Sequence, residues 1–69
     1  MYEELPEDLK EFGTQVAEEI RLGAWDGKYD KKSPVMESRL ILQELENRCP
    51  GYSIEEYRSA IAYGLFVTR

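Results

Sequence analysis

The chain has 69 residues with nine basic and 14 acidic side chains, a net charge of −5 at pH 7, and a length that allows one domain with a small core. It has no histidine and one cysteine, which excludes an intramolecular disulfide, a Cys/His zinc site and catalysis of the Ser-His or Cys-His kind. Its 42% hydrophobic content argues against disorder. No apolar run reaches a membrane-spanning length, and the acidic start is unlike a signal peptide. We therefore expect a reduced, cytoplasmic protein.

The first predicted helix covers residues 6–22. Pro6 suits the first helical position, acids follow in the first turn, and Gly23 suits a helix stop. At about 100° per residue, the apolar side chains form one stripe, which consists of Leu5, Leu9, Phe12, Val16 and Ile20. The opposite, solvent-facing stripe is acidic and consists of Glu4, Glu7, Asp8, Glu11, Glu18 and Glu19.

The segment GAWDGKYDKKSP, residues 23–34, contains the only tryptophan of the chain. Asp26-Gly27 is a hairpin signal, but two very short strands alone are marginal in water. We therefore predict an irregular loop, with a short hairpin-like ribbon as the alternative. Trp25 is predicted to fold back over the open end of the helices; alternatively, it forms a contact patch for a partner together with Tyr29 and the nearby lysines.

Two further helices are predicted over residues 34–48 and 54–66. Ser33-Pro34 is typical of a helix start, Pro50-Gly51 of a helix end, and Ser53 with Glu56 of a capping box. The predicted inward faces consist of Val35, Ser38, Ile41, Leu42, Leu45 and Cys49 in one helix and Ile54, Tyr57, Ile61 and Leu65 in the other. The predicted fold is all-α, a small three-helix bundle that forms a single domain over residues 1–69.

Several large apolar side chains fall outside these inward faces. They are Met36, Leu40, Tyr63, Phe66 and Val67. Scattered apolar exposure is ordinary, but aromatic and methionine side chains are also enriched at the centres of protein interfaces. We favour an interface, either with another protein or with a second copy, because a core this small benefits from a partner.

No catalytic or metal-binding arrangement is predicted. The carboxylate pairs of the first helix lie on its solvent face, where nothing raises a pKa. The loop from Asp26 to Asp30 lacks the spacing of a calcium hand, no phosphate-binding glycine loop occurs, and Cys49 is expected to be a buried, inert thiol. We therefore expect neither enzymatic activity nor a cofactor.

Residues 39–61, RLILQELENRCPGYSIEEYRSAI, resemble the early helices of winged-helix repressors. The resemblance implies a helix-turn-helix and, as an alternative function, nucleic-acid binding. The third helix begins with Ile-Glu-Glu, however, and Glu55 and Glu56 would repel phosphate. Clustering of the arginines on one exposed face would favour DNA binding, whereas dispersal or pairing with glutamates would oppose it; these arginines are Arg39, Arg48, Arg58 and Arg69.

The sequence thus predicts a small, acidic, non-catalytic regulator or inhibitor that binds a protein partner. In size and acidity it is similar in style to small regulators carried by phages and bacteria. Two modes are open: apolar contact through the outer faces of the second and third helices, and docking of the acidic first helix on a basic surface. The residues expected to bind the partner are Trp25, Met36, Leu40, Tyr63, Phe66, Val67, Glu7, Glu11 and Glu18.

Overall fold

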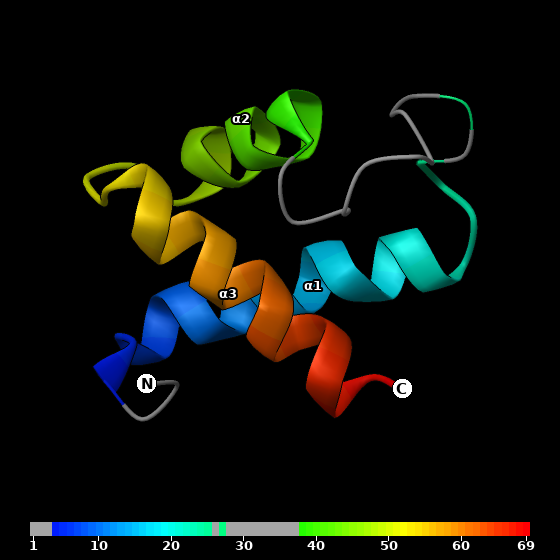
Figure 1. Ribbon diagram of the computed structural model, residues 1–69, viewed down its shortest axis with the longest axis horizontal. Helices are drawn as coiled ribbons and strands as arrows, with labels where there is room; N and C mark the ends of the chain where they lie inside the picture. The colour runs from blue at the N-terminus through cyan, green and yellow to red at the C-terminus, as the bar shows by residue number, and fades with distance from the viewer. Residues whose placement is uncertain (1–3, 26, 28–37) are drawn as a thin grey trace.

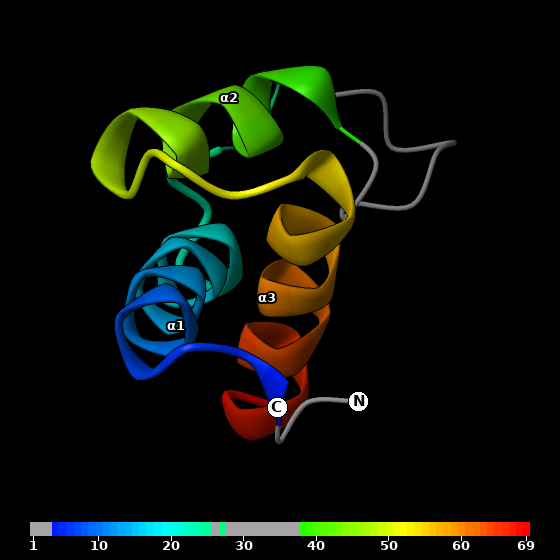
Figure 2. The same ribbon diagram turned by 90° about the vertical axis from the view of Figure 1, so that its left-hand side faces the viewer.

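The computed structural model describes residues 4–25, 27 and 38–69. They form three helices, α1 (Glu7–Arg21), α2 (Arg39–Arg48) and α3 (Ile54–Val67). Helices α1 and α3 cross each other, and α2 lies over one side of the pair (Figures 1 and 2). Within these described residues there is no strand, and the prediction of a small all-α bundle is confirmed.

The crossing of α1 and α3 depends on small side chains. A Cβ atom built on Gly13 would lie 2.5 Å from the carbonyl oxygen of Ala60, and one on Gly64 would lie 2.5 Å from that of Gly13 and 2.8 Å from the Ala17 Cβ. Each helix therefore presents a glycine and an alanine one turn apart, and the two backbones touch. The order of the contacts shows that both helices run in the same general direction.

Helix α1 ends as the sequence predicts. Gly23 has a φ of 88°, a left-handed conformation that favours glycine. Its N–H donates to the carbonyl of Ile20 at 3.1 Å, and the N–H of Ala24 donates to that of Glu19 at 2.9 Å, which together form a Schellman motif. At the other end, Pro6 occupies the N-cap, one position before the predicted one.

Helix α3 also begins as predicted, whereas α2 begins later. The Ser53 hydroxyl accepts from the N–H of Glu56, whose carboxylate accepts from the N–H of Ser53, and this completes the capping box. Helix α2 begins at Arg39, because Ser38 has extended dihedrals. The first residues of the predicted helix, 34–37, lie outside the described residues.

The core lies where the three helices meet. Its fully buried large side chains are Leu9, Val16, Ile41, Leu45, Tyr57 and Ile61. The turn between α2 and α3 is held by Tyr57, whose hydroxyl donates to the carbonyl of Cys49 at 2.8 Å, and by Tyr52, whose hydroxyl donates to the Asp8 carboxylate at 3.1 Å. None of the helices in the described part of the chain is long and apolar enough to cross a membrane.

One predicted core residue is on the surface. The Ile54 side chain is 54% exposed, although it shares a helix stripe with Ile61, which is 0% exposed. The stripe gives the angle of a side chain around α3, but burial also requires a neighbour at the same height along the axis. Helix α1 crosses α3 near Ala60 and Gly64, and Ile54 lies in the first turn, beyond that crossing.

Candidate protein-binding site

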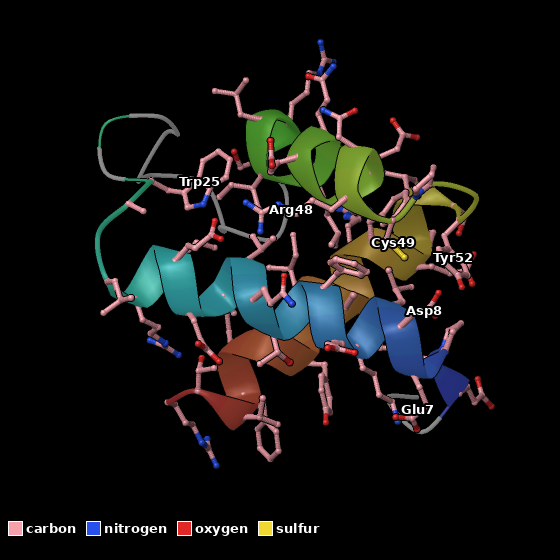
Figure 3. The ribbon with its side chains drawn as sticks, turned by 180° about the vertical axis from the view of Figure 1, so that it is seen from behind. Glu7, Asp8, Trp25, Arg48, Cys49 and Tyr52 are labelled. Carbon is pink, nitrogen blue, oxygen red and sulfur yellow. The ribbon has the colours of Figure 1, made fainter. Side chains whose placement is uncertain are left out.

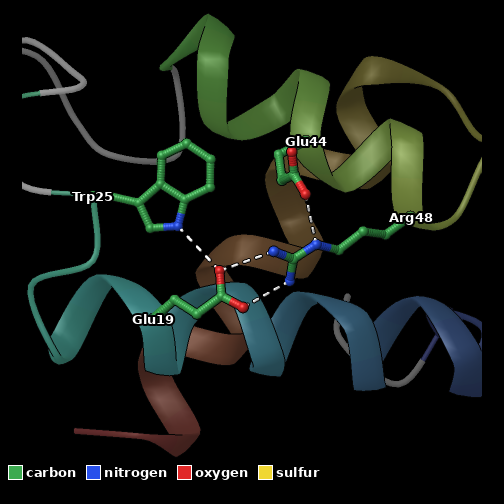
Figure 4. Close-up of polar contacts among 4 residues, drawn as sticks. All are labelled: Glu19, Trp25, Glu44 and Arg48. Carbon is green, nitrogen blue, oxygen red and sulfur yellow. Dashed lines mark hydrogen bonds and ion pairs between the residues drawn. The ribbon is translucent and has the colours of Figure 1, made fainter.

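A polar network joins α1, α2 and the start of the loop that follows α1 (Figures 3 and 4). The guanidinium of Arg48 donates to both carboxylate oxygens of Glu19 at 2.9 Å and, through Nε, to Glu44 at 2.8 Å. The Arg48 bonds hold the pKa of Glu19 below its ordinary value. The prediction that Glu19 lies on the solvent face is therefore wrong, because this side chain points at α2.

Trp25 belongs to this network. Its indole N–H donates to Glu19 at 3.2 Å, and its partly buried ring packs against the core. Figure 3 shows the ring beside Arg48, in the space between α1 and α2. This position agrees with the prediction that Trp25 folds back over the open end of the helices. Residues 26 and 28–37, on which the hairpin alternative depends, lie outside the described residues.

A hollow of about 600 Å3 lies between α2 and α3, and we call it the α2–α3 hollow. Its lining combines apolar side chains with polar and charged ones and consists of Arg39, Leu42, Gln43, Glu46, Ile54, Tyr57 and Arg58. Leu42 and Tyr57 are core residues, whereas Ile54 is open to solvent. A concave apolar surface with a few polar groups around it is the usual form of a binding site.

Three of the residues in this lining carry charge. Arg39 is exposed and forms no ion pair within the described part of the chain. Arg58 donates to Glu55 at 3.2 Å, and Glu46 is exposed on the opposite helix. The lining therefore holds two cations and one acid, and a second acid, Glu55, pairs with one of these cations.

Sequence reasoning did not identify this hollow. It assigned Ile54 to the core and treated Arg39 and Arg58 only as possible phosphate contacts. The available signal was an isoleucine directly after the Ser53 N-cap, a position in the first turn that a neighbouring helix need not cover. The apolar pattern of α2 places Gln43 on its outward side. It does not show that Gln43 lies beside α3, because the apolar pattern of one helix does not show how that helix packs on another.

The acidic residues predicted for partner binding lie on a second surface. Glu7, Glu11 and Glu18 are exposed along α1, and together with Tyr63 of α3 they line a shallow hollow. Lys10 lies within the same surface, because its Nζ is 3.9 Å from Glu7 and 5.6 Å from the centre of the Tyr63 ring. The structure therefore brings four of the predicted residues together on one surface, and Lys10 interacts with two of them, Glu7 and Tyr63.

The apolar residues predicted for binding do not form one surface. Leu40 is exposed on α2, and Phe66 and Val67 are exposed in the last turn of α3, which lies on the side of the molecule away from α2 (Figures 1 and 2). Tyr63 is partly buried against the core, so it is not surplus in the predicted sense. Met36 lies outside the described residues.

The cysteine is placed as predicted. Cys49 is a buried free thiol whose Sγ donates to Asp8 at 3.8 Å, and burial together with the Asp8 charge raises its thiol pKa. A thiol of this kind is a poor nucleophile. Within residues 4–25, 27 and 38–69, no three metal-binding side chains of the His, Cys, Asp or Glu type gather in one place.

The arginines are distributed over several parts of the molecule. Arg48 pairs with glutamates between α1 and α2, Arg58 pairs with Glu55, and Arg69 lies 4.6 Å from the centre of the Phe66 ring. Arg39 lies with Arg58 in the lining of the α2–α3 hollow and has no ion pair among the described residues, so the four arginines neither gather on one face nor all pair with glutamates. The sequence matches no protein-family model, no curated protein and no solved structure.

Proposed function

We propose that this protein is a small, non-catalytic binding module that docks another protein in the α2–α3 hollow. The observation that carries the proposal is the exposure of Ile54 beside the core residues Leu42 and Tyr57. Covering a large apolar side chain in a concave, partly apolar site is favourable by about 25 cal/mol per Å2 of surface removed from water. Single exposed apolar side chains are ordinary, but Ile54 differs from the others in that it lies in a hollow beside core residues.

Protein binding is supported over nucleic-acid binding by the side chains around the hollow. Glu46 lines it and Glu55 pairs with one of its two arginines. These carboxylates oppose a phosphate backbone, whose affinity for proteins depends on clustered basic residues. Ile54, the most exposed member of the apolar part, would contribute little to phosphate contacts.

Two other modes of protein binding remain as proposals. A basic partner would meet Glu11 and Glu18 on the acidic surface of α1, and a second copy would meet the exposed Leu40 or the apolar end of α3. Regulation or inhibition of the partner would be the biological result. We place this activity in a reducing compartment such as the cytoplasm, where a free thiol like that of Cys49 is the common state.

Photo-crosslinking from matched positions tests the proposal. Gln43 lines the α2–α3 hollow, Gln15 lines the acidic surface, and both glutamines are exposed, so a benzophenone amino acid at either position is tolerated equally. In the cells from which the chain derives, we expect a protein adduct from position 43 that disappears when Ile54→Ser is added. Adducts from position 15 alone, or from neither position, would contradict the proposal.

A further inference from the structure

We infer that the protein bound in the α2–α3 hollow is a second copy of this chain, placed so that α2 of each copy lies antiparallel in the hollow of the other. This inference rests on the proposed function and names the partner. In a two-fold symmetric pair the same surface serves both copies, so that surface must be complementary to itself. The charges, the helix ends and the apolar part of the α2–α3 hollow all meet this requirement.

The unpaired charges of the hollow are opposite in sign and lie at the two ends of its α2 side. Arg39 and Glu46 are both exposed, and neither forms an ion pair among the described residues. They are seven residues apart, so they share one face of α2 and are separated by about 10 Å along its axis. When a second α2 lies antiparallel on this face, Arg39 of each copy meets Glu46 of the other, and two ion pairs form.

The remaining charges of the hollow allow a second copy to approach. Arg58 donates to Glu55 at 3.2 Å, so the charges in the lining and this added acid sum to zero. The whole chain carries −5, and the acidic surface of α1 would repel the same surface of a second copy. Two copies therefore meet with less repulsion through the hollow than through that surface.

The two unpaired charges are placed against the dipole of their own helix. Arg39 is the first residue of α2, at its positive end, and Glu46 lies in the last turn, at its negative end. In an antiparallel pair, each end of α2 lies beside the opposite end of the other α2. Arg39 then lies near a negative helix end and Glu46 near a positive one, so an arrangement that is unfavourable in the single chain becomes favourable in the pair.

The apolar part of the hollow supplies the buried contact of the pair. Ile54 is 54% exposed and lies in the lining beside two core residues, so α2 of the second copy removes it from water. Gln43 lies about midway between the two charges and therefore near the two-fold axis. Its amide is both a donor and an acceptor, as a side chain that meets its own counterpart must be.

Charge reversal in two variants tests the pairing. Arg39→Glu makes both ends acidic and Glu46→Arg makes both basic, so each variant repels itself but is complementary to the other. Sedimentation velocity of the full chain from about 1 μM to about 1 mM measures the association. We expect the wild type to form dimers and each variant alone to associate at least tenfold more weakly. An equimolar mixture of the two variants should recover the wild-type association to within about threefold.

Controls with the same change of net charge separate this pairing from general repulsion. Arg69→Glu and Glu11→Arg change the charge equally at positions outside the hollow, so each should associate as the wild type does. Both reversals within α2 should preserve the fold, because an acid at the start of a helix and a base in its last turn suit the helix dipole. Circular dichroism of each variant verifies this.

A second pair of variants tests the apolar contact. Ile54→Ser should weaken the dimer about tenfold, because both copies lose the buried side chain. Val67→Ser removes a similarly exposed β-branched side chain from the last turn of α3, outside the hollow, and should have no effect.

Three results would overturn the inference: a monomer over the whole range, an association that charge reversal leaves unchanged, and a mixture that stays as weak as its components. A dimer that is lost in Val67→Ser but not in Ile54→Ser would also overturn it, in favour of contact through the end of α3. The photo-crosslink from position 43 separates this inference from the proposed function. An adduct of two copies supports both, whereas an adduct with a different protein alone supports the proposed function and overturns this inference.

Discussion

Helix α3 has two very different neighbours. Along its second half it touches α1 so closely that Gly13 and Gly64 have no room for a methyl group. Along its first turn it borders α2 across a hollow that leaves Ile54 half exposed. In a protein of this size the same helix therefore has one side that is closed by backbone contact and another that is open to solvent.

The difference shows how a small chain can be held together on one side and leave apolar surface open on another. Small residues bring α1 and α3 together, and dispersion between closely packed backbones supplies part of the stability that a larger core would otherwise give. Helix α2 is attached by a few buried leucine and isoleucine side chains and by the bonds of Arg48 to α1. The loss of cover over Ile54 is then tolerable, because the α1–α3 contact does not depend on it.

The largest effect is expected at the closed side. Gly13→Ala should destabilise the protein by about 2 kcal/mol or more, because the new Cβ would meet the Ala60 backbone, although alanine has the higher helix propensity by about 1 kcal/mol. Urea denaturation followed by circular dichroism measures the change. Gln15→Ala, two residues away and exposed, is the control and should change stability by less than about 0.5 kcal/mol. A stabilised Gly13→Ala would show that the helices are not in backbone contact.

Much of the fold could be predicted from the sequence, because helix caps and apolar stripes are local signals. The Gly23 stop and the Ser53–Glu56 capping box lie within one turn of the helices they end or begin. The spacings Gly13-xxx-Ala17 and Ala60-xxx-Gly64 each place two small residues on one helix face, but the spacing alone does not show that these two faces meet. The pairing of Glu19 with Arg48 and the exposure of Ile54 could not be predicted, because both depend on where α2 lies along its neighbours.

A smaller effect is expected from the attachment of α2. In a double-mutant cycle, Glu19→Gln and Arg48→Gln should show a coupling free energy of about 1 kcal/mol, since the bond is two-pronged but partly exposed. The same cycle on the pair formed by Glu55 and Arg58, within the first turns of α3, should give about 0.3 kcal/mol. Equal coupling in the two cycles would mean that the Arg48 bond does not hold α2 in place.

The same pair predicts a pH dependence. Because the pKa of Glu19 is lowered in the folded protein, its contribution to stability is present above its ordinary pKa of 4.5 and is lost as the pH falls through the folded value. The difference in unfolding free energy between the wild type and Glu19→Gln should therefore be largest near pH 7 and shrink in acid. The fluorescence of Trp25, which donates to Glu19, is expected to shift to the red on unfolding and so follows the unfolding transition at each pH. A difference in unfolding free energy that stays constant from pH 7 into acid would contradict a lowered pKa of Glu19 in the folded protein.

The smallest effect on stability is expected at Leu40, which is 53% exposed on the outer face of α2. Leu40→Glu should change the unfolding free energy by less than about 0.5 kcal/mol and preserve helical content, while any self-association through this face is weakened. Sedimentation velocity at several concentrations measures the association. Loss of the fold in this variant would show that Leu40 belongs to the core.

The proposed docking site requires that Ile54 contributes little to the packed core of the free protein. Unfolding free energies of Ile54→Ala and Ile61→Ala, two variants that remove the same atoms from one stripe of α3, test this most directly. We expect a loss below about 0.5 kcal/mol for Ile54→Ala and about 3 kcal/mol for Ile61→Ala, in line with their exposures of 54% and 0%. Losses of similar size at both positions would show that Ile54 is packed in the free protein and that the α2–α3 hollow is closed.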